Sequence, residues 1–75
     1  MSIIRKYWTG TEDFYLAGKV LESISNGNTL LNAFKEAATY LNTNVNECEF
    51  RWNAVLADYY SMPLAHAKYQ RKLKL

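Results

Sequence analysis

Hydrophobic residues recur every three or four positions along most of this chain, which is the spacing of amphipathic α-helices. The first such segment begins behind Thr9 and Glu12, whose spacing is typical of a helix-capping box. It predicts a helix over residues 10–25, and Gly27 suits the left-handed residue that follows many helix ends. The apolar face of this helix consists of Leu16, Ala17, Val20, Leu21 and Ile24.

Two further helices are expected on either side of the polar run Asn42-Thr43-Asn44, which favours a turn and a new helix cap. The second helix begins near Thr29, and its apolar face consists of Leu30, Leu31, Phe34, Ala37, Ala38 and Leu41. The third helix should bury a stripe made of Cys48, Trp52, Val55, Leu56 and Tyr59. Its outward side carries Asn46, Phe50, Asn53, Ala54 and Ala57, bordered by Glu47 and Arg51 on one flank and Glu49 on the other.

Pro63 marks the end of the third helix and is tolerated in the first turn of another. Residues 62–75 are therefore expected to form a basic tail or a basic fourth helix that starts near Leu64. No strand pattern competes anywhere, so the predicted fold class is all-α. The expected organisation is a three-helix domain over residues 1–61, followed by the basic segment 62–75.

Composition excludes several classes of protein. A chain of 75 residues is one small domain, and its 15% aromatic content can supply the core. Cys48 is the only cysteine, so an internal disulfide is excluded and a closed zinc site lacks ligands. His66 has no nucleophilic partner and no glycine-rich phosphate loop exists, so we expect no enzyme, cofactor, metal or small-molecule substrate. The lack of a signal peptide or a long apolar run favours a cytoplasmic protein without membrane contact.

Charge is distributed unevenly along the chain. Residues 1–61 carry seven acidic and five basic side chains, whereas the tail has four basic residues and no acid. Any attraction to phosphate is therefore expected from the tail and from an N-terminal arm. These basic residues are Arg5, Lys6, Lys68, Arg71, Lys72 and Lys74.

Three aromatic residues connect this pattern with a family. Trp8 is followed by Thr9 and then Glu12-Asp13, which is similar to the start of a Myb or SANT repeat. Phe34 and Trp52 resemble the remaining members of the Myb aromatic triplet, and their separation suits it. The interval from Trp8 to Phe34 is longer than usual. The resemblance implies a helix-turn-helix bundle in which Trp8, Phe34, Cys48 and Trp52 belong to the structural core.

A narrower resemblance covers nearly the whole chain. The segment from Cys48 to Asn53, with Trp8-Thr9, Leu16, Gly27 and the lysine-rich end, is similar to the N-terminal Myb-like domain of the prespore-specific regulator RsfA family. This resemblance implies a sporulation-type transcription regulator that binds double-stranded DNA on the bacterial nucleoid. Family members continue into a long coiled-coil region, and their third helix is less acidic. From length alone we expect a phage-borne or mobile-element relative, which would act in the host cytoplasm.

The third helix is the expected reading element. Asn46, Glu49, Phe50 and Asn53 would face the major groove, where Asn53 suits adenine and Phe50 suits a thymine methyl. Phe50 could instead pack against the second helix or the tail. For Arg51 we prefer an ion pair with Glu12 or Asp13 over a phosphate contact. The expected function is a monomeric Myb-like domain that binds DNA weakly, with its basic ends on phosphates.

A protein-interaction module is the alternative. Glu47 and Glu49 would be repelled by phosphates but could pair with a basic protein surface. In that case Phe50 would anchor a partner such as a host transcription factor, and the chain would act as a small co-regulator or inhibitor.

Overall fold

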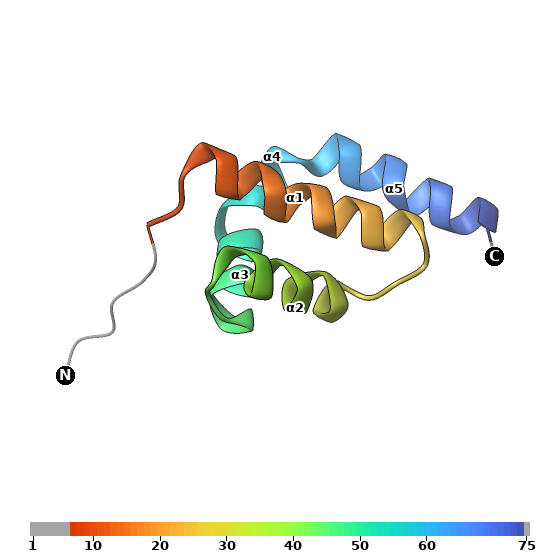
Figure 1. Ribbon diagram of the computed structural model, residues 1–75. Coiled ribbons are helices and arrows are strands. Elements are labelled where there is room, and N and C mark those ends of the chain that lie inside the picture. The colour runs from red at the N-terminus through yellow and green to blue at the C-terminus, as the bar shows by residue number, and fades with distance from the viewer. Residues whose placement is uncertain (1–6, 75) are drawn as a thin grey trace.

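The computed structural model describes residues 7–74, and every regular element in that range is helical. The order is α1 (Gly10–Ser25), α2 (Leu30–Leu41), α3 (Val45–Arg51), the π-helical turn η1 (Trp52–Leu56), α4 (Ala57–Tyr59) and α5 (Ser61–Lys74). In Figure 1, α1 lies between α2 and α5, and the rod formed by α3, η1 and α4 passes behind. The predicted all-α class and the predicted fourth helix are therefore confirmed, although α5 starts at Ser61 rather than near Leu64.

The predicted ends of the first two helices are confirmed by their caps. The Thr9 hydroxyl accepts from the Glu12 amide at 3.2 Å, and the Thr9 amide donates to the Glu12 carboxylate at 3.1 Å, which completes the capping box. Gly27 has φ +84°, a conformation that glycine adopts without steric cost. Thr29 caps α2 by accepting from the Asn32 amide at 3.1 Å.

The core lies where α1, α2 and the α3–α4 rod meet. It consists of Leu16, Ala17, Val20, Ile24, Ala33, Phe34, Ala37, Ala38, Cys48, Trp52, Leu56 and Ala67. The alanines of α2 and α5 allow close approach of neighbouring helices, while Phe34 and Trp52 fill the space between them. Ala67 brings α5 into this core, so the basic segment is packed along α1.

The π-helical turn changes which residues of the third helix are buried. Cys48, Trp52 and Leu56 are buried at successive intervals of four residues, although each such step drifts by about 40° on a regular α-helix. The Ala57 amide donates to the Trp52 carbonyl, five residues back, and this wider turn keeps Leu56 facing the core. The prediction that Val55 and Tyr59 share the buried stripe was wrong, because a regular helical period was assumed; both are exposed.

The first turn of α2 also differs from the prediction. Leu30 and Leu31 are exposed instead of belonging to the packed face, and Ala33 is fully buried in their place. This first turn lies at the end of the bundle, where α5 faces it across a groove and does not cover it.

An ion pair joins α3 directly to α1. The Arg51 guanidinium donates from Nε to Oδ1 of Asp13 at 2.8 Å and from Nη2 to Oδ2 at 2.7 Å. Both side chains are mostly shielded from solvent, with 27% of Arg51 and 19% of Asp13 exposed. The hydrogen bond to Asp13 raises the pKa of Arg51. The expectation that Arg51 pairs with Glu12 or Asp13 is confirmed for Asp13.

Removing either partner of this pair should destabilise the fold. We expect Asp13→Ala and Arg51→Ala each to lower the free energy of unfolding by about 1–3 kcal/mol, because each leaves a partly shielded charge without its partner. Chemical denaturation of the two single variants and the double variant measures the coupling between them. Asp58→Ala, in an exposed side chain of α4, is the control. A coupling energy near zero would mean that the pair contributes nothing to the fold.

Candidate nucleic-acid interface

The turn between α2 and α3 sets the direction of the third helix. Asn42 ends α2 in the left-handed conformation, with φ 57° and ψ 49°, and the Thr43 amide donates to the Ala38 carbonyl at 2.9 Å. Asn44 then caps α3, because its side-chain oxygen accepts from the Glu47 amide at 2.9 Å. Three polar residues thus connect the two packed helices α2 and α3.

The outward face of the third helix carries the residues predicted to read DNA. Asn46, Glu49, Phe50 and Asn53 are all exposed, and together with Ala54 they line a shallow hollow of about 410 Å³. They lie on the side of the rod opposite the buried stripe of Cys48, Trp52 and Leu56. Asn53 and Ala54 belong to η1, so the π-helical turn sets their position relative to Asn46.

The electrostatic character of this face is acidic. Between residues 45 and 60 the sequence has one basic side chain, Arg51, against Glu47, Glu49 and Asp58. Because Arg51 binds both carboxylate oxygens of Asp13 through Nε and Nη2, its charge is directed toward α1. Glu47 lies in the first turn of α3, where a negative charge interacts favourably with the helix dipole. Glu49 is exposed on this face and adds to its negative charge.

The predicted phosphate contacts fall in two places. Arg5 and Lys6 lie outside the described residues. In α5, Lys68 and the last-turn residues Arg71, Lys72 and Lys74 are exposed. Nζ of Lys74 donates to the side-chain oxygen of Asn26 at 2.8 Å, which joins the end of α5 to the turn between α1 and α2.

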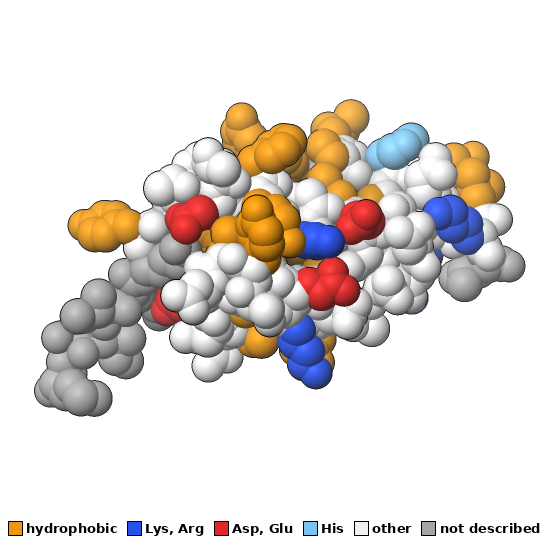
Figure 2. All heavy atoms as spheres, viewed as in Figure 1, with side chains coloured by type: hydrophobic (Ala, Val, Ile, Leu, Met, Phe, Trp, Pro, Cys, Tyr) orange, Lys and Arg blue, Asp and Glu red, His pale blue; other side chains and the backbone are white. Residues whose placement is uncertain are grey.

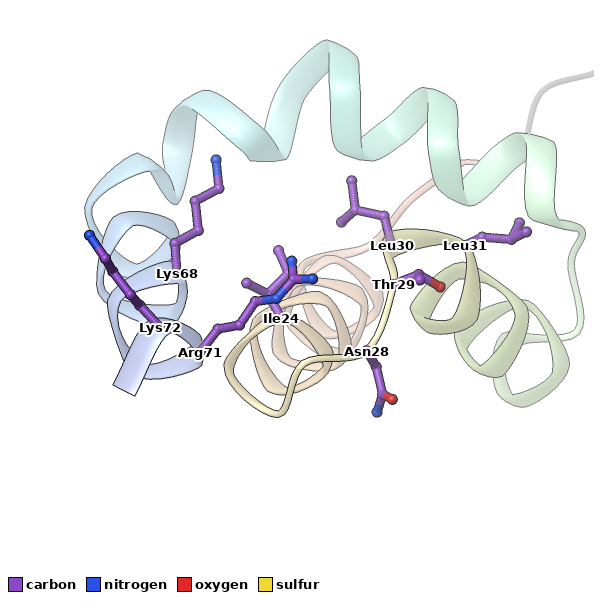
Figure 3. Close-up of a pocket in the computed structure, with 8 residues that line it drawn as sticks. All are labelled: Ile24, Asn28, Thr29, Leu30, Leu31, Lys68, Arg71 and Lys72. Carbon is purple, nitrogen blue, oxygen red and sulfur yellow. The ribbon is translucent and has the colours of Figure 1, made fainter. Parts of the chain in front are cut away.

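A groove of about 700 Å³ separates this end of α5 from the start of α2. Lys68, Arg71 and Lys72 line one side, Leu30 and Leu31 the other, with Ile24 between them. In Figure 3, Arg71 reaches toward Ile24, whereas Lys72 points away from the α1 axis. This basic-rimmed groove was not predicted, because its formation depends on the docking of α5 against α1. The spacing of Leu64 and Ala67 was the available signal for that docking.

The residues expected in the core do not line either of these surfaces. Phe34, Cys48 and Trp52 are buried, with at most 4% of each exposed, and Trp8 packs against the core from a partly buried position before α1. They position α3 from behind and are not available to a large ligand. Among residues 7–74, no group of His, Cys, Asp and Glu side chains could hold a metal ion, and no helix is suited to cross a membrane.

Comparison with known proteins identifies a relative. The chain is 41% identical over 73 residues to the sporulation-specific transcriptional regulator GerR of Bacillus subtilis (strain 168). The match covers 96% of the chain and 38% of GerR, so the chain spans well under half the length of this curated relative. No known family profile matches the chain, and no solved structure matches it. The chain is thus related in sequence, over almost its whole length, to a transcriptional regulator.

Truncation of Phe50 and of Trp52 should have very different effects on stability. Phe50 is 49% exposed and Trp52 is 2% exposed. We expect Phe50→Ala to cost less than about 1 kcal/mol of unfolding free energy, whereas Trp52→Ala should cost about 3–5 kcal/mol. Thermal and chemical denaturation measure both. A loss of several kcal/mol for Phe50→Ala would instead assign this side chain a packing role.

Proposed function

We propose that the chain is the DNA-binding domain of a sporulation transcription regulator, with a Myb-like helix-turn-helix in which α3 enters the major groove. The observation that carries the proposal is the shared hollow on α3 and η1, where Asn46, Glu49, Phe50 and Asn53 lie together on the exposed side of the helix that follows α2. The sequence relationship to GerR, which is named a transcriptional regulator, supports the same function.

Three exposed residues of α3 and η1 have a chemistry that suits a base edge. The Asn53 amide can both accept and donate, which matches the N7 and N6 groups of adenine. The Glu49 carboxylate can accept from the N4 amine of cytosine, and the Phe50 ring can contact a thymine methyl. All of these contacts would carry sequence information, and none of them neutralises phosphate.

Affinity would then come from α5. Lys68, Arg71 and Lys72 lie together on one side of the groove, and contacts with phosphates would release counterions from the DNA. The acidic α3 opposes this attraction, so the domain should bind non-specific DNA weakly. In this arrangement the acidic helix restricts binding to sites whose base contacts offset the repulsion.

Titration with a labelled mixed-sequence duplex at low and moderate salt tests the proposal. Binding should weaken steeply with salt, and replacing Lys68, Arg71 and Lys72 with alanine should reduce the slope of log K against log salt by up to about 3. Glu49→Lys should tighten non-specific binding, because it replaces repulsion with attraction. Lys35→Ala, in an exposed cation of α2, is the matched control and should change the slope little.

Two outcomes would contradict the proposal. One is a folded domain that does not bind duplex DNA at low salt. The other is binding that remains unchanged in Glu49→Lys, which would remove α3 from the interface.

A protein-interaction function is the second candidate, favoured by the pairing of Arg51 with Asp13. Because Arg51 is held by Asp13, the exposed face of α3 presents acidic side chains around a half-exposed Phe50. Such a face suits a basic protein surface with an apolar pocket. Phe50 would then be the anchor and Glu49 part of the rim.

Cross-linked pull-downs from sporulating cells with wild type and Phe50→Ala test this candidate. A partner bound through α3 should be lost in Phe50→Ala and kept in Tyr69→Ala, which removes a similarly exposed aromatic ring from α5. Equal recovery with both variants would exclude Phe50 as the anchor.

A further inference from the structure

A second hollow lies between α1 and α2, away from both surfaces described above. It has a volume of about 370 Å³ and lies on the side of α1 that the core and α5 leave uncovered. Figure 2 shows the molecule from the same side as Figure 1. Hydrophobic side chains lie in the middle of this face, directly beside basic and acidic ones. Its lining consists of Thr11, Phe14, Tyr15, Gly18, Lys19, Glu22, Tyr40 and Leu41.

Aromatic side chains form the walls of this hollow. Tyr15 of α1 stacks on Tyr40 of α2, with ring centroids 4.2 Å apart and an interplanar angle of 17°. Tyr40 and Phe14 nevertheless remain 70% and 72% exposed. A group of rings that holds two helices together and still exposes most of its outer surface is typical of an interaction site.

Gly18 points to close approach by another molecule. It lies in the middle of α1, where glycine destabilises a helix relative to alanine. A Cβ atom built at this position would meet nothing within 4 Å, so packing inside the chain does not require a glycine. A surface that comes close to the backbone of α1 would require one, because the absent side chain leaves room for it.

Charges of both signs lie beside the hollow. Nζ of Lys19 lies 3.5 Å from a carboxylate oxygen of Glu22 and 3.5 Å from one of Glu36. One positive and two negative side chains therefore border the same apolar patch. Such a rim is complementary to itself, since a two-fold rotation can bring the lysine of each copy toward the carboxylates of the other.

We propose that a second copy of this chain occupies the hollow, which gives a two-fold homodimer through α1 and α2. The exposed aromatic rings of each copy pack against the open helix surface at Gly18 of the other. The contact is small, so the dimer is weak and dissociates on dilution. Because the α3–α4 rod passes behind α1 and α2 in Figure 1, pairing leaves the outward face of α3 uncovered in both copies. The proposal does not rest on DNA binding and is tested without DNA.

Sedimentation equilibrium over a range of protein concentrations tests the dimer. The weight-average mass of the wild type should rise from 8.7 kDa toward twice that value. Gly18→Ala should raise the melting temperature by about 2–8 °C and yet weaken association by about tenfold. Gly10→Ala, which also adds a methyl group in open space on α1 but outside the hollow, is the matched control and should leave association unchanged.

Exchange of charges shows whether the partner is the same chain. Lys19→Glu alone and Glu22→Lys with Glu36→Lys should each prevent self-association, because like charges then face each other. An equal mixture of these two variants should restore association as a heterodimer. A wild type that stays monomeric up to its solubility limit overturns the proposal. Association that persists unchanged in Gly18→Ala and in Lys19→Glu overturns it too.

Discussion

The bidentate ion pair between Arg51 and Asp13 is the interaction on which the placement of α3 in this domain depends. It fixes α3 to α1 through two short hydrogen bonds in a place where solvent is largely excluded. The same contact takes the only basic side chain between residues 45 and 60 away from the exposed side of the helix. The orientation of the third helix and the acidic character of its surface therefore have one physical origin.

The domain consequently separates positive charge from the exposed face of its third helix. Cations are concentrated along α5, which packs against α1 and carries Lys68, Arg71 and Lys72 beside the start of α2. The outward side of α3 carries amides, a carboxylate and a half-exposed ring. This separation suits a domain in which electrostatic attraction and base recognition are supplied by different helices. The acidic face of α3 would equally suit a protein partner with a basic surface, which is the alternative to DNA.

Much of the fold follows from local signals in the sequence. The capping box at Thr9, the left-handed Gly27 and the cap at Asn44 define helix ends through contacts between close neighbours, so they could be predicted. The π-helical turn could not, because it accompanies the packing of Leu56 against distant helices, which contacts between close neighbours in the sequence do not reveal. The exposure of Leu30 and the groove beside α5 likewise depend on how distant helices dock. The outward residues Asn46, Glu49, Phe50 and Asn53 could be predicted. They lie before the π-helical turn or near its start, so the change in helical period displaces them little.

In the proposed complex with DNA, α3 and η1 contact bases while α5 contacts phosphates. Amide and side-chain NMR spectra recorded during titration with duplex DNA test it most directly, because they report on both helices in one experiment. We expect the signals of Asn46, Glu49 and Asn53 to shift together with those of Lys68, Arg71 and Lys72. Shifts confined to α5, with the α3 signals unchanged at saturation, would contradict it.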